Sequence, residues 1–250
     1  MGSWVELWCI GWEGVEGARM ERWVKREAFL SFQELERARG YRRRERRWEF
    51  MCGRSLLKVL LARHLGVAPQ EVELLEGREG KPYLGVGGHV GVSHSGGYCL
   101  VAFSPDFPLG VDLERIRFDL ELERMMRRFF SPLEREYLEG LELEEQRGVF
   151  FQIWTYKEAW GKFLGRGLNL AELRKYSLGK EGLGVFCRGR SWIQEGRWIY
   201  PLSLASPWLR GTLVSGGEVE RWRVWEGSLE EWWARYGFRE GGRDWLEVIK

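Results

Sequence analysis

Apolar and polar positions in the first half of the chain follow two rhythms, one typical of strands and one of helices. Apolar residues alternate well enough between Trp4 and Trp12 to predict an edge strand. A mixed helical pattern covers 18–39. A stronger one, with a 3.6-residue rhythm, runs from Arg42 to Leu65, and Gly66 is suited to cap that helix. Short apolar runs bounded by turn residues predict four more strands, at Val72–Leu75, His89–Ser93, Tyr98–Ser104 and Leu109–Glu114.

The second half repeats the broad order of the first, with helices followed by strands. Helices are predicted at 119–130, at Pro132–Leu138 with Ser131 as its N-cap, and at Glu144–Leu164. Short apolar runs then predict strands at Tyr176–Leu178, Leu183–Cys187, Trp192–Tyr200 and Thr212–Ser215. A short helix at Leu229–Tyr236 is expected to pack onto the body through Trp232, Trp233 and Tyr236.

These elements predict an α+β protein divided at the proline-bearing loop between Pro105 and Pro108. The predicted parts are an N-terminal subdomain (1–107), a C-terminal subdomain with the candidate metal site (108–216) and a C-terminal tail packed on the body (217–250).

Charge and composition narrow the class of protein. The chain has 250 residues with a formal net charge of only +2, which argues against a nucleic-acid coat or a membrane-surface protein. It has no apolar run long enough to cross a bilayer, and Met1–Gly14 lacks the basic start of a secretory signal. Its four cysteines are far apart and form no C-x-x-C pair, which indicates a reduced, cytoplasmic protein with buried thiols.

Three carboxylates and a lysine are the strongest candidates for chemistry. Asp112 and Glu114 lie two apart on a predicted strand and therefore project from the same face, where hard oxygen ligands suit Mg²⁺. Trp154, Glu158 and Lys162 lie four apart on one face of the long helix. A Glu and a Lys directed at the first two carboxylates would resemble a metal ligand and a phosphate binder, although a surface Glu–Lys pair beside an aromatic anchor fits the same spacing.

Two further segments leave alternatives open. Ser93-His94-Ser95 follows a strand, but its surroundings lack the final glycine of a hydrolase G-x-S-x-G turn, and His94 could instead bind a phosphate. The basic run Arg42–Arg47 fits a solvated helix face, or an anion site for RNA or for nucleotide phosphates. An RNA-binding module and a serine hydrolase built on Ser93 are therefore the competing functions.

Taken in order, five motifs resemble the signature of Sfp-type 4′-phosphopantetheinyl transferases. They lie at Gly80-Lys81-Pro82, Val92-Ser93-His94-Ser95, Gly110-Val111-Asp112-Leu113-Glu114, Arg128-Phe129-Phe130-Ser131 and Trp154-x-x-Lys157-Glu158-Ala159-x-x-x-Lys162. The resemblance implies two similar α/β subdomains in a pseudo-twofold arrangement, with coenzyme A in the cleft between them. It also implies transfer of the phosphopantetheine arm to a serine of an acyl or peptidyl carrier protein, with Mg²⁺ as cofactor, by a monomer. The near-neutral charge and the lack of a long apolar run argue against a membrane or nucleic acid as partner.

The resemblance assigns roles to individual residues. Asp112, Glu114 and Glu158 would hold Mg²⁺, and Asp112, Glu158 and Lys162 would act in catalysis. Glu134 matches an acidic family position near the metal, and Trp154 and Lys157 match positions of the family's signature helix. Where relatives carry a basic residue that would bind the 3′-phosphate, this chain has Glu49, so Arg47, Arg54 or another arginine of the 42–47 run is expected to supply that contact. Arg124, Arg127 and Arg128 are candidates for a basic surface that docks the acidic carrier. The expected coenzyme contacts are Lys81, Ser93, His94, Arg47, Arg54, Lys157 and Lys162.

Overall fold

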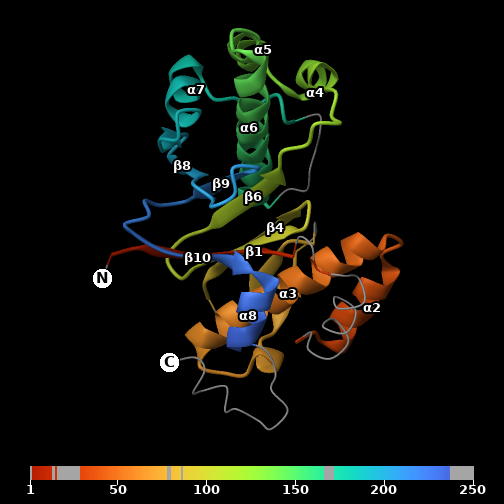
Figure 1. Ribbon diagram of the computed structural model, residues 1–250. Coiled ribbons are helices and arrows are strands. Elements are labelled where there is room, and N and C mark those ends of the chain that lie inside the picture. The colour runs from red at the N-terminus through yellow and green to blue at the C-terminus, as the bar shows by residue number, and fades with distance from the viewer. Residues whose placement is uncertain are drawn as a thin grey trace.

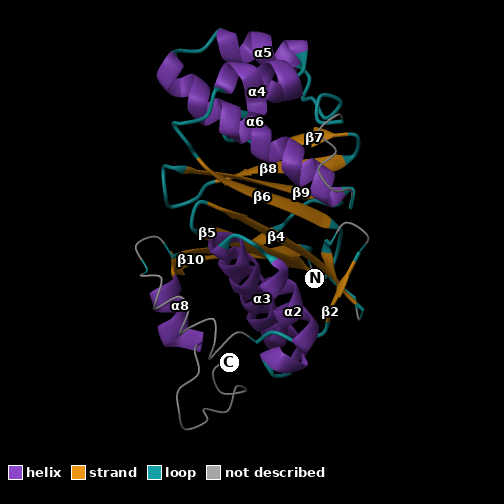
Figure 2. Cartoon of the chain, turned by 90° about the vertical axis from the view of Figure 1, so that its right-hand side faces the viewer, coloured by secondary structure: helices purple, strands orange, loops and turns teal. Residues whose placement is uncertain are grey.

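Two four-stranded sheets lie one against the other in the computed structural model, and helices cover the outer face of each sheet (Figures 1 and 2). The structure describes residues 2–12, 15, 29–77, 80–85, 87–165 and 172–236. None of the helices within these ranges is both long and apolar enough to cross a membrane.

The N-terminal sheet is covered by one long, buried helix. Its strand order is β10-β1-β5-β4, from β10 (Arg221–Ser228), β1 (Trp4–Gly11), β5 (Tyr98–Ser104) and β4 (His89–Ser95). Helix α3 (Arg44–Leu65) packs on it, and ends where Gly66 adopts a left-handed φ of 69° and caps Ala62 O. The smaller elements of this half are α2 (Phe32–Gly40), a 3₁₀ turn (Pro69–Glu71), β2 (Leu74–Glu76) and β3 (Pro82–Leu84).

The C-terminal sheet has the strand order β6-β9-β8-β7 and is covered by helix α6 (Leu143–Phe163). In both halves the chain runs through a strand, a long helix and a hairpin, and the first strand pairs with the last one of the hairpin. The strands are β6 (Leu109–Arg115), β7 (Trp192–Gln194), β8 (Arg197–Leu202) and β9 (Leu209–Ser215), and the smaller helices are α4 (Leu122–Phe129), α5 (Pro132–Glu139) and α7 (Lys180–Phe186).

Three apolar cores hold these layers together. One lies between α3 and the N-terminal sheet, a second between α6 and the C-terminal sheet, and a third between the two sheets. Within β6 the alternation of side chains decides which core each residue joins. Val111 and Leu113 enter the core between the sheets, so Asp112 and Glu114 project from the opposite face, toward α6. The inter-sheet core therefore fixes the direction of the two carboxylates.

Two strand predictions in the second half are wrong. Residues 183–187 were expected to form a strand, but Lys180–Phe186 is helix α7, which buries Leu183 and Phe186 at the three-residue spacing of a helix face. Residues 176–178 form no strand. The predicted strand at 192–200 is a hairpin, β7 and β8, because Glu195 and Gly196 make a turn with positive φ.

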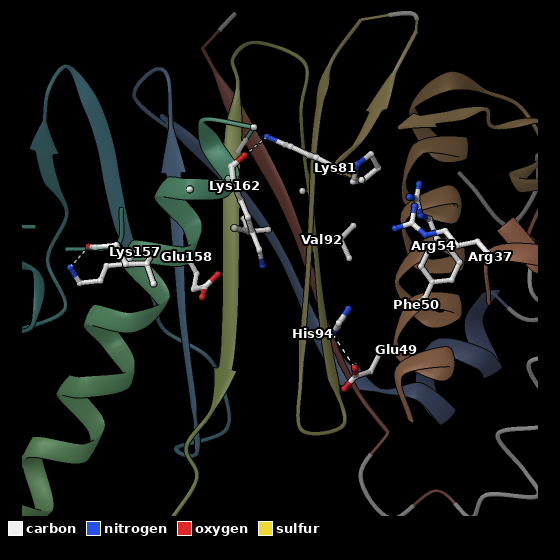
Figure 3. A pocket seen from close by; sticks show the side chains of 18 of the residues that line it. Arg37, Glu49, Phe50, Arg54, Lys81, Val92, His94, Lys157, Glu158 and Lys162 are labelled. Carbon is white, nitrogen blue, oxygen red and sulfur yellow. Dashed lines mark hydrogen bonds and ion pairs between the residues drawn. The ribbon is translucent and has the colours of Figure 1, made fainter. Parts of the chain in front are cut away.

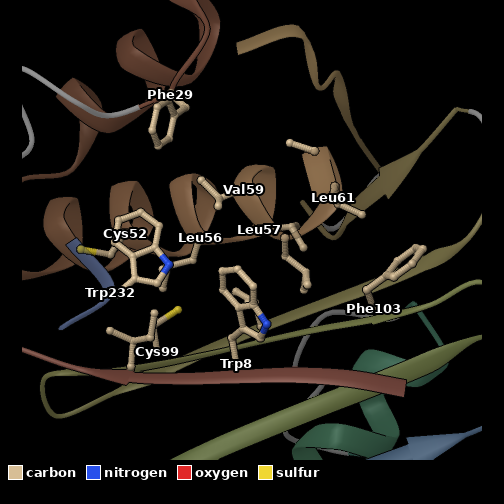
Figure 4. Packing of buried hydrophobic residues seen from close by; sticks show 14 of the residues in the cluster. Trp8, Phe29, Cys52, Leu56, Leu57, Val59, Leu61, Cys99, Phe103 and Trp232 are labelled. Atoms are coloured by element: carbon tan, nitrogen blue, oxygen red, sulfur yellow. The ribbon is translucent and has the colours of Figure 1, made fainter. Parts of the chain in front are cut away.

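The segment that the sequence assigned to a C-terminal tail supplies an edge strand of the N-terminal sheet. Strand β10 pairs in parallel with all eight residues of β1. Helix α8 (Leu229–Tyr236) follows, and its Trp232 is fully buried among Trp8, Leu56 and Cys52 (Figure 4). The side chains of Trp233 and Tyr236, and the predicted helical residues 18–28, lie outside the described residues.

The buried indole of Trp232 provides a test of this arrangement. Trp232→Ala should lower the free energy of unfolding by about 3–5 kcal/mol, because the large cavity it leaves opens inside the N-terminal core. Phe32→Ala, at a side chain that is 72% exposed, should change it by about 0.5 kcal/mol or less. Urea denaturation measures both, and equal values for the two variants would show that α8 contributes nothing to that core.

Candidate active site

Strands β4 and β6 are the edge strands of the two sheets, and they run side by side in parallel where the two halves meet (Figure 3). Among the described residues, β4 pairs with β5 and β6 pairs with β9, and no backbone ladder joins β4 to β6. Serine hydroxyls connect these two strands instead. Ser93 Oγ accepts from Leu113 N at 3.2 Å, and Ser95 Oγ accepts from Arg115 N at 3.2 Å. The junction between the halves is thus a row of polar groups.

The same two serines hold the carboxylates of β6. Ser93 Oγ donates to Asp112 Oδ1 at 2.8 Å, and Ser95 Oγ donates to Glu114 Oε2 at 2.6 Å. Side chains on a strand alternate, so Ser93 and Ser95 face β6 whereas His94 faces the other way. The signature Ser93-His94-Ser95 therefore places two hydroxyls at the carboxylates and the imidazole in a different part of the site.

A glycine on β6 lets helix α6 approach the carboxylates. A Cβ at Gly110 would lie 2.2 Å from Ala159 O and 2.4 Å from Phe163 N, so only glycine permits this contact between strand and helix backbone. Glu158 and Lys162 are thereby brought beside Asp112, and Lys162 Nζ lies 2.7 Å from Asp112 Oδ1 and 2.9 Å from Ser93 Oγ. Trp154, on the same face of α6, stacks on Phe150 and forms an aromatic anchor.

The three carboxylates repel one another in a buried site. Burial, and next the charge of Asp112, raise the pKa of Glu158 to about 8, although Lys162 opposes the shift. The pKa of Glu114 is raised by the same two causes in the same order. Asp112 Oδ2 is buried and has no hydrogen-bond partner in the described part of the chain. One lysine does not balance three carboxylates, so the site would favour an additional cation.

The donor set fits Mg²⁺, although it does not form a closed ligand shell. Among the described residues, no group of three His, Cys, Asp or Glu side chains lies close enough together to hold a metal ion as it stands. Mg²⁺ is usually held by one or two carboxylates together with water and phosphate oxygens of a substrate, so a complete protein cage is not required. Asp112, Glu114 and Glu158 remain the predicted ligands.

The raised pKa of Glu158 predicts how pH affects the protein without divalent cations. The folded state retains a proton on Glu158 that the unfolded chain loses above about pH 4.5. Through this group, the free energy of unfolding therefore falls as the pH rises from about 5 to 8. We expect Glu158→Gln to remove this contribution, so that its Tm exceeds that of the parent by a margin that grows toward pH 8.

Mg²⁺ should raise the parent's Tm more at pH 8 than at pH 5, because the cation binds the ionised carboxylates. Thermal scans in EDTA and in Mg²⁺ test both effects. A difference in Tm between parent and Glu158→Gln that stays constant from pH 5 to 8 would rule out the raised pKa.

A cavity of about 270 Å³ lies between the two halves, and Glu158 and Lys162 line one end of it. At the far end, Arg54 and Arg37 both pair with Glu76 and both lie over the ring of Phe50, with guanidinium carbons 5.4 and 5.1 Å from its centre (Figure 3). Sequence reasoning identified Arg54 but missed Arg37, whose only local signal is a basic residue in the last turn of α2.

His94 and Lys81 also line the cavity. His94 Nδ1 lies 3.2 Å from Glu49 Oε2. Glu49, which occupies the position where a basic residue was expected, therefore orients the imidazole of His94. Burial tends to raise the pKa of Glu49, but His94 and Arg46 outweigh it and lower the pKa. Lys81 Nζ reaches across from the N-terminal half to Leu109 O and Lys162 O, at 2.9 and 2.7 Å. Burial, and then the charge of Lys162, lower its pKa to about 8.

Two expected coenzyme contacts are not supported by the geometry. Lys157 lines the cavity, but its Nζ is buried and contacts Glu134 Oε2, Leu173 O and Tyr176 O at 2.7–2.8 Å, which engages all three of its protons. Its partner Glu134, which was expected near the metal, is also buried and forms an ion pair with Lys157. Arg47 donates to Tyr41 O at 3.3 Å and is not among the residues that line the cavity. The causes differ: the protons of Lys157 are taken by other groups, whereas Arg47 lies away from the cavity.

The buried pair leads to a stability prediction. Burial raises the pKa of Glu134 and lowers that of Lys157, against their mutual attraction, so each depends on the other to remain charged. Glu134→Gln should cost about 3–5 kcal/mol of unfolding free energy because it leaves Lys157 buried without a counter-charge. The double variant Glu134→Gln/Lys157→Met should lose less than the single one in urea denaturation. A larger loss in the double variant would contradict this account.

Neither competing function is supported by the geometry. A serine hydrolase needs a base at its serine, but the partners of Ser93 Oγ are Asp112, Leu113 and Lys162, and His94 is directed at Glu49. The arginines of the Arg42–Arg46 stretch are exposed at the start of α3, as on a solvated helix face.

Comparisons with known proteins agree with the site. Residues 108–187, which include β6, α6 and the carboxylates, match the family model of the 4′-phosphopantetheinyl transferase superfamily. The chain is 38% identical to the 4′-phosphopantetheinyl transferase HetI of Nostoc sp. over 173 residues, covering 67% of this chain and 71% of HetI. It is 36% identical to a putative 4′-phosphopantetheinyl transferase of Synechocystis sp. over 147 residues, covering 57% of this chain and 60% of that protein.

A third relative, the 4′-phosphopantetheinyl transferase Sfp of Bacillus subtilis, is 27% identical over 164 residues, covering 62% of this chain and 72% of Sfp. The chain belongs to the 4′-phosphopantetheinyl transferase superfamily.

Proposed function

We propose that this chain transfers the 4′-phosphopantetheine arm of coenzyme A to a serine of an apo acyl or peptidyl carrier protein, with Mg²⁺ bound and 3′,5′-ADP released. The observation that carries the proposal is the crowding of Asp112, Glu114 and Glu158 beside Lys162, at one end of a cavity whose other end is lined by arginines. Such a site attracts a cation at the carboxylates and anionic groups at the basic residues.

The substrate would lie along the cavity between the two halves. Arg37, Arg54, Lys81 and His94 line it and would contact the phosphates of the nucleotide end, while Phe50 offers an aromatic face. Ser93 and Lys162, at the carboxylates, would contact the pyrophosphate. Arg47 does not line the cavity, and the three protons of Lys157 are engaged by other groups, so we assign neither of them to the coenzyme.

Bound Mg²⁺, held by Asp112, Glu114 and Glu158, would draw charge from the pyrophosphate oxygens and the leaving group. We assign to Glu158 the removal of the proton from the acceptor serine. The serine oxygen then forms a bond to the phosphorus on the pantetheine side, and the phosphorus–oxygen bond to 3′,5′-ADP breaks. Lys162 offsets the charge that develops on the phosphate oxygens.

The first experiment incubates the chain with coenzyme A, Mg²⁺ and a panel of apo acyl and peptidyl carrier proteins, and measures the intact mass of each carrier. We expect one carrier to gain a single phosphopantetheine and EDTA to abolish the gain. Glu158→Gln should reduce kcat by about 100-fold or more, because it removes the proton acceptor. Glu139→Gln, at an exposed carboxylate of α5, should leave kcat unchanged.

Full transfer in EDTA would contradict the role of Mg²⁺. Absence of transfer to any carrier would contradict the proposed reaction, and Mg²⁺-independent, salt-sensitive binding of RNA would return the RNA-binding alternative. We also predict a cytoplasmic location and a monomeric state. The monomer is expected because the described part of the site is formed within one chain.

A further inference from the structure

Two guanidinium groups and one carboxylate meet at the far end of the cavity. Arg37, in the last turn of α2, and Arg54, within α3, both lie over the ring of Phe50 (Figure 3). Glu76, the last residue of β2, binds both arginines. Its Oε2 accepts from Arg37 Nη1, and its Oε1 accepts from Arg54 Nη2. A single carboxylate therefore keeps two like charges side by side.

Arg54 is the member of this group that most needs a counter-charge. Its side chain is only 5% exposed, and a buried cation without a partner lowers the stability of the fold. Burial lowers the pKa of Arg54, while the charges of Glu76 and then Glu34 oppose that shift. Among the described residues, no carboxylate other than Glu76 forms an ion pair with either arginine. Glu76 therefore balances the charge of Arg54 within the protein itself.

The pair with Glu76 does not use every donor of the arginines. Arg54 Nη1 is buried and has no hydrogen-bond partner in the part of the chain that the structure describes. Both arginines line the cavity, whereas Glu76 is not one of its lining residues. A buried donor is costly unless some group accepts from it. This end of the cavity is therefore suited to an anion, which the proposed function supplies as a phosphate of the nucleotide.

Glu76 opposes the binding of a phosphate whether it stays at the arginines or leaves them. Its side chain is 36% exposed, and β2 pairs with β3 alone among the described strands, so turning the carboxylate into water breaks no ladder of the two main sheets. A phosphate would then replace it, with roughly two negative charges and several acceptor oxygens. If Glu76 stayed, its charge would repel the bound phosphate. In both cases removal of Glu76 strengthens phosphate binding.

We infer that Glu76 is an internal counter-ion that competes with the phosphates of the nucleotide for Arg37 and Arg54. It balances Arg54 before the coenzyme binds, and it pairs with the arginines again when 3′,5′-ADP leaves. Coenzyme A and 3′,5′-ADP carry the same phosphates on the ribose, so a competing carboxylate weakens the binding of the product. The inference rests on the proposed function and deepens it, because it assigns to Glu76 a role in product release.

Calorimetry with 3′,5′-ADP, in the absence of any carrier protein, tests this role. Glu76→Gln should bind 3′,5′-ADP about fivefold or more tightly than the parent chain, because the competing charge is gone. The difference in affinity should shrink as salt is added. In the transfer assay, the inhibition constant of 3′,5′-ADP should fall by the same factor.

Thermal unfolding separates competition from a purely structural role. Glu76→Gln should have a lower Tm than the parent without nucleotide, because Arg54 loses its counter-charge. Saturating 3′,5′-ADP should narrow that difference, since the phosphate balances Arg54 in the complex. A structural role alone would lower the Tm equally with and without 3′,5′-ADP, and that result would overturn the inference.

Two further variants serve as controls. Glu73→Gln removes the same charge from an exposed position three residues earlier, and should leave the affinity for 3′,5′-ADP within about twofold. Glu76→Asp keeps a counter-charge near Arg54 on a shorter side chain, so it tests the role of Glu76 even if Glu76→Gln does not fold. It should bind 3′,5′-ADP more tightly than the parent, by a smaller margin than Glu76→Gln.

The remaining outcomes separate this inference from the proposed function. Weaker binding of 3′,5′-ADP by Glu76→Gln would overturn the inference, because Glu76 would then orient the arginines toward the phosphate. Equal binding by the parent and both Glu76 variants would also overturn it, while the transferase proposal stands. If the parent binds neither 3′,5′-ADP nor coenzyme A, the proposed function fails and this inference fails with it.

Discussion

The contact between the edge strands β4 and β6 is the constraint on which the rest of the site depends. Two sheets that met through a backbone ladder would leave no space between them for other groups. Here the hydroxyls of Ser93 and Ser95 accept from the backbone of β6 and donate to Asp112 and Glu114. The same two side chains therefore join the halves and orient the carboxylates. The cavity opens along this junction because the strands are linked by side chains.

The crowded carboxylates of the candidate site lower the stability of the folded state, and apolar packing offsets this loss. Asp112, Glu114 and Glu158 are crowded in a buried place, and the raised pKa of Glu158 expresses that cost. Three apolar cores, one between each helix layer and its sheet and one between the sheets, hold the arrangement against this repulsion. The close contact between Gly110 and α6 adds to this crowding, because it brings Glu158 and Lys162 near Asp112.

The cations around the cavity divide into supporting and substrate-facing groups. Lys157 holds Glu134 and the carbonyls of Leu173 and Tyr176, so it connects α5, α6 and the segment before α7. Lys81 reaches across the junction to backbone carbonyls of the other half while it lines the cavity. Arg37 and Arg54 line the far end of the cavity, where both lie over the ring of Phe50.

The sequence by itself determined the elements that have a strong local pattern. The periodicity of α3 and α6, the Ser131 cap of α5 and the two-residue spacing of Asp112 and Glu114 are local properties, and the structure confirms each of them. Only the tertiary structure decided that β10 joins β1, that 180–186 is helical and that Arg37 reaches the cavity whereas Arg47 does not. The physical reason is that a short apolar run fits either a helix or a strand until its neighbours are known. In the same way, the partner of a charged side chain depends on which distant elements the fold brings together, and the local spacing of residues does not predict that partner.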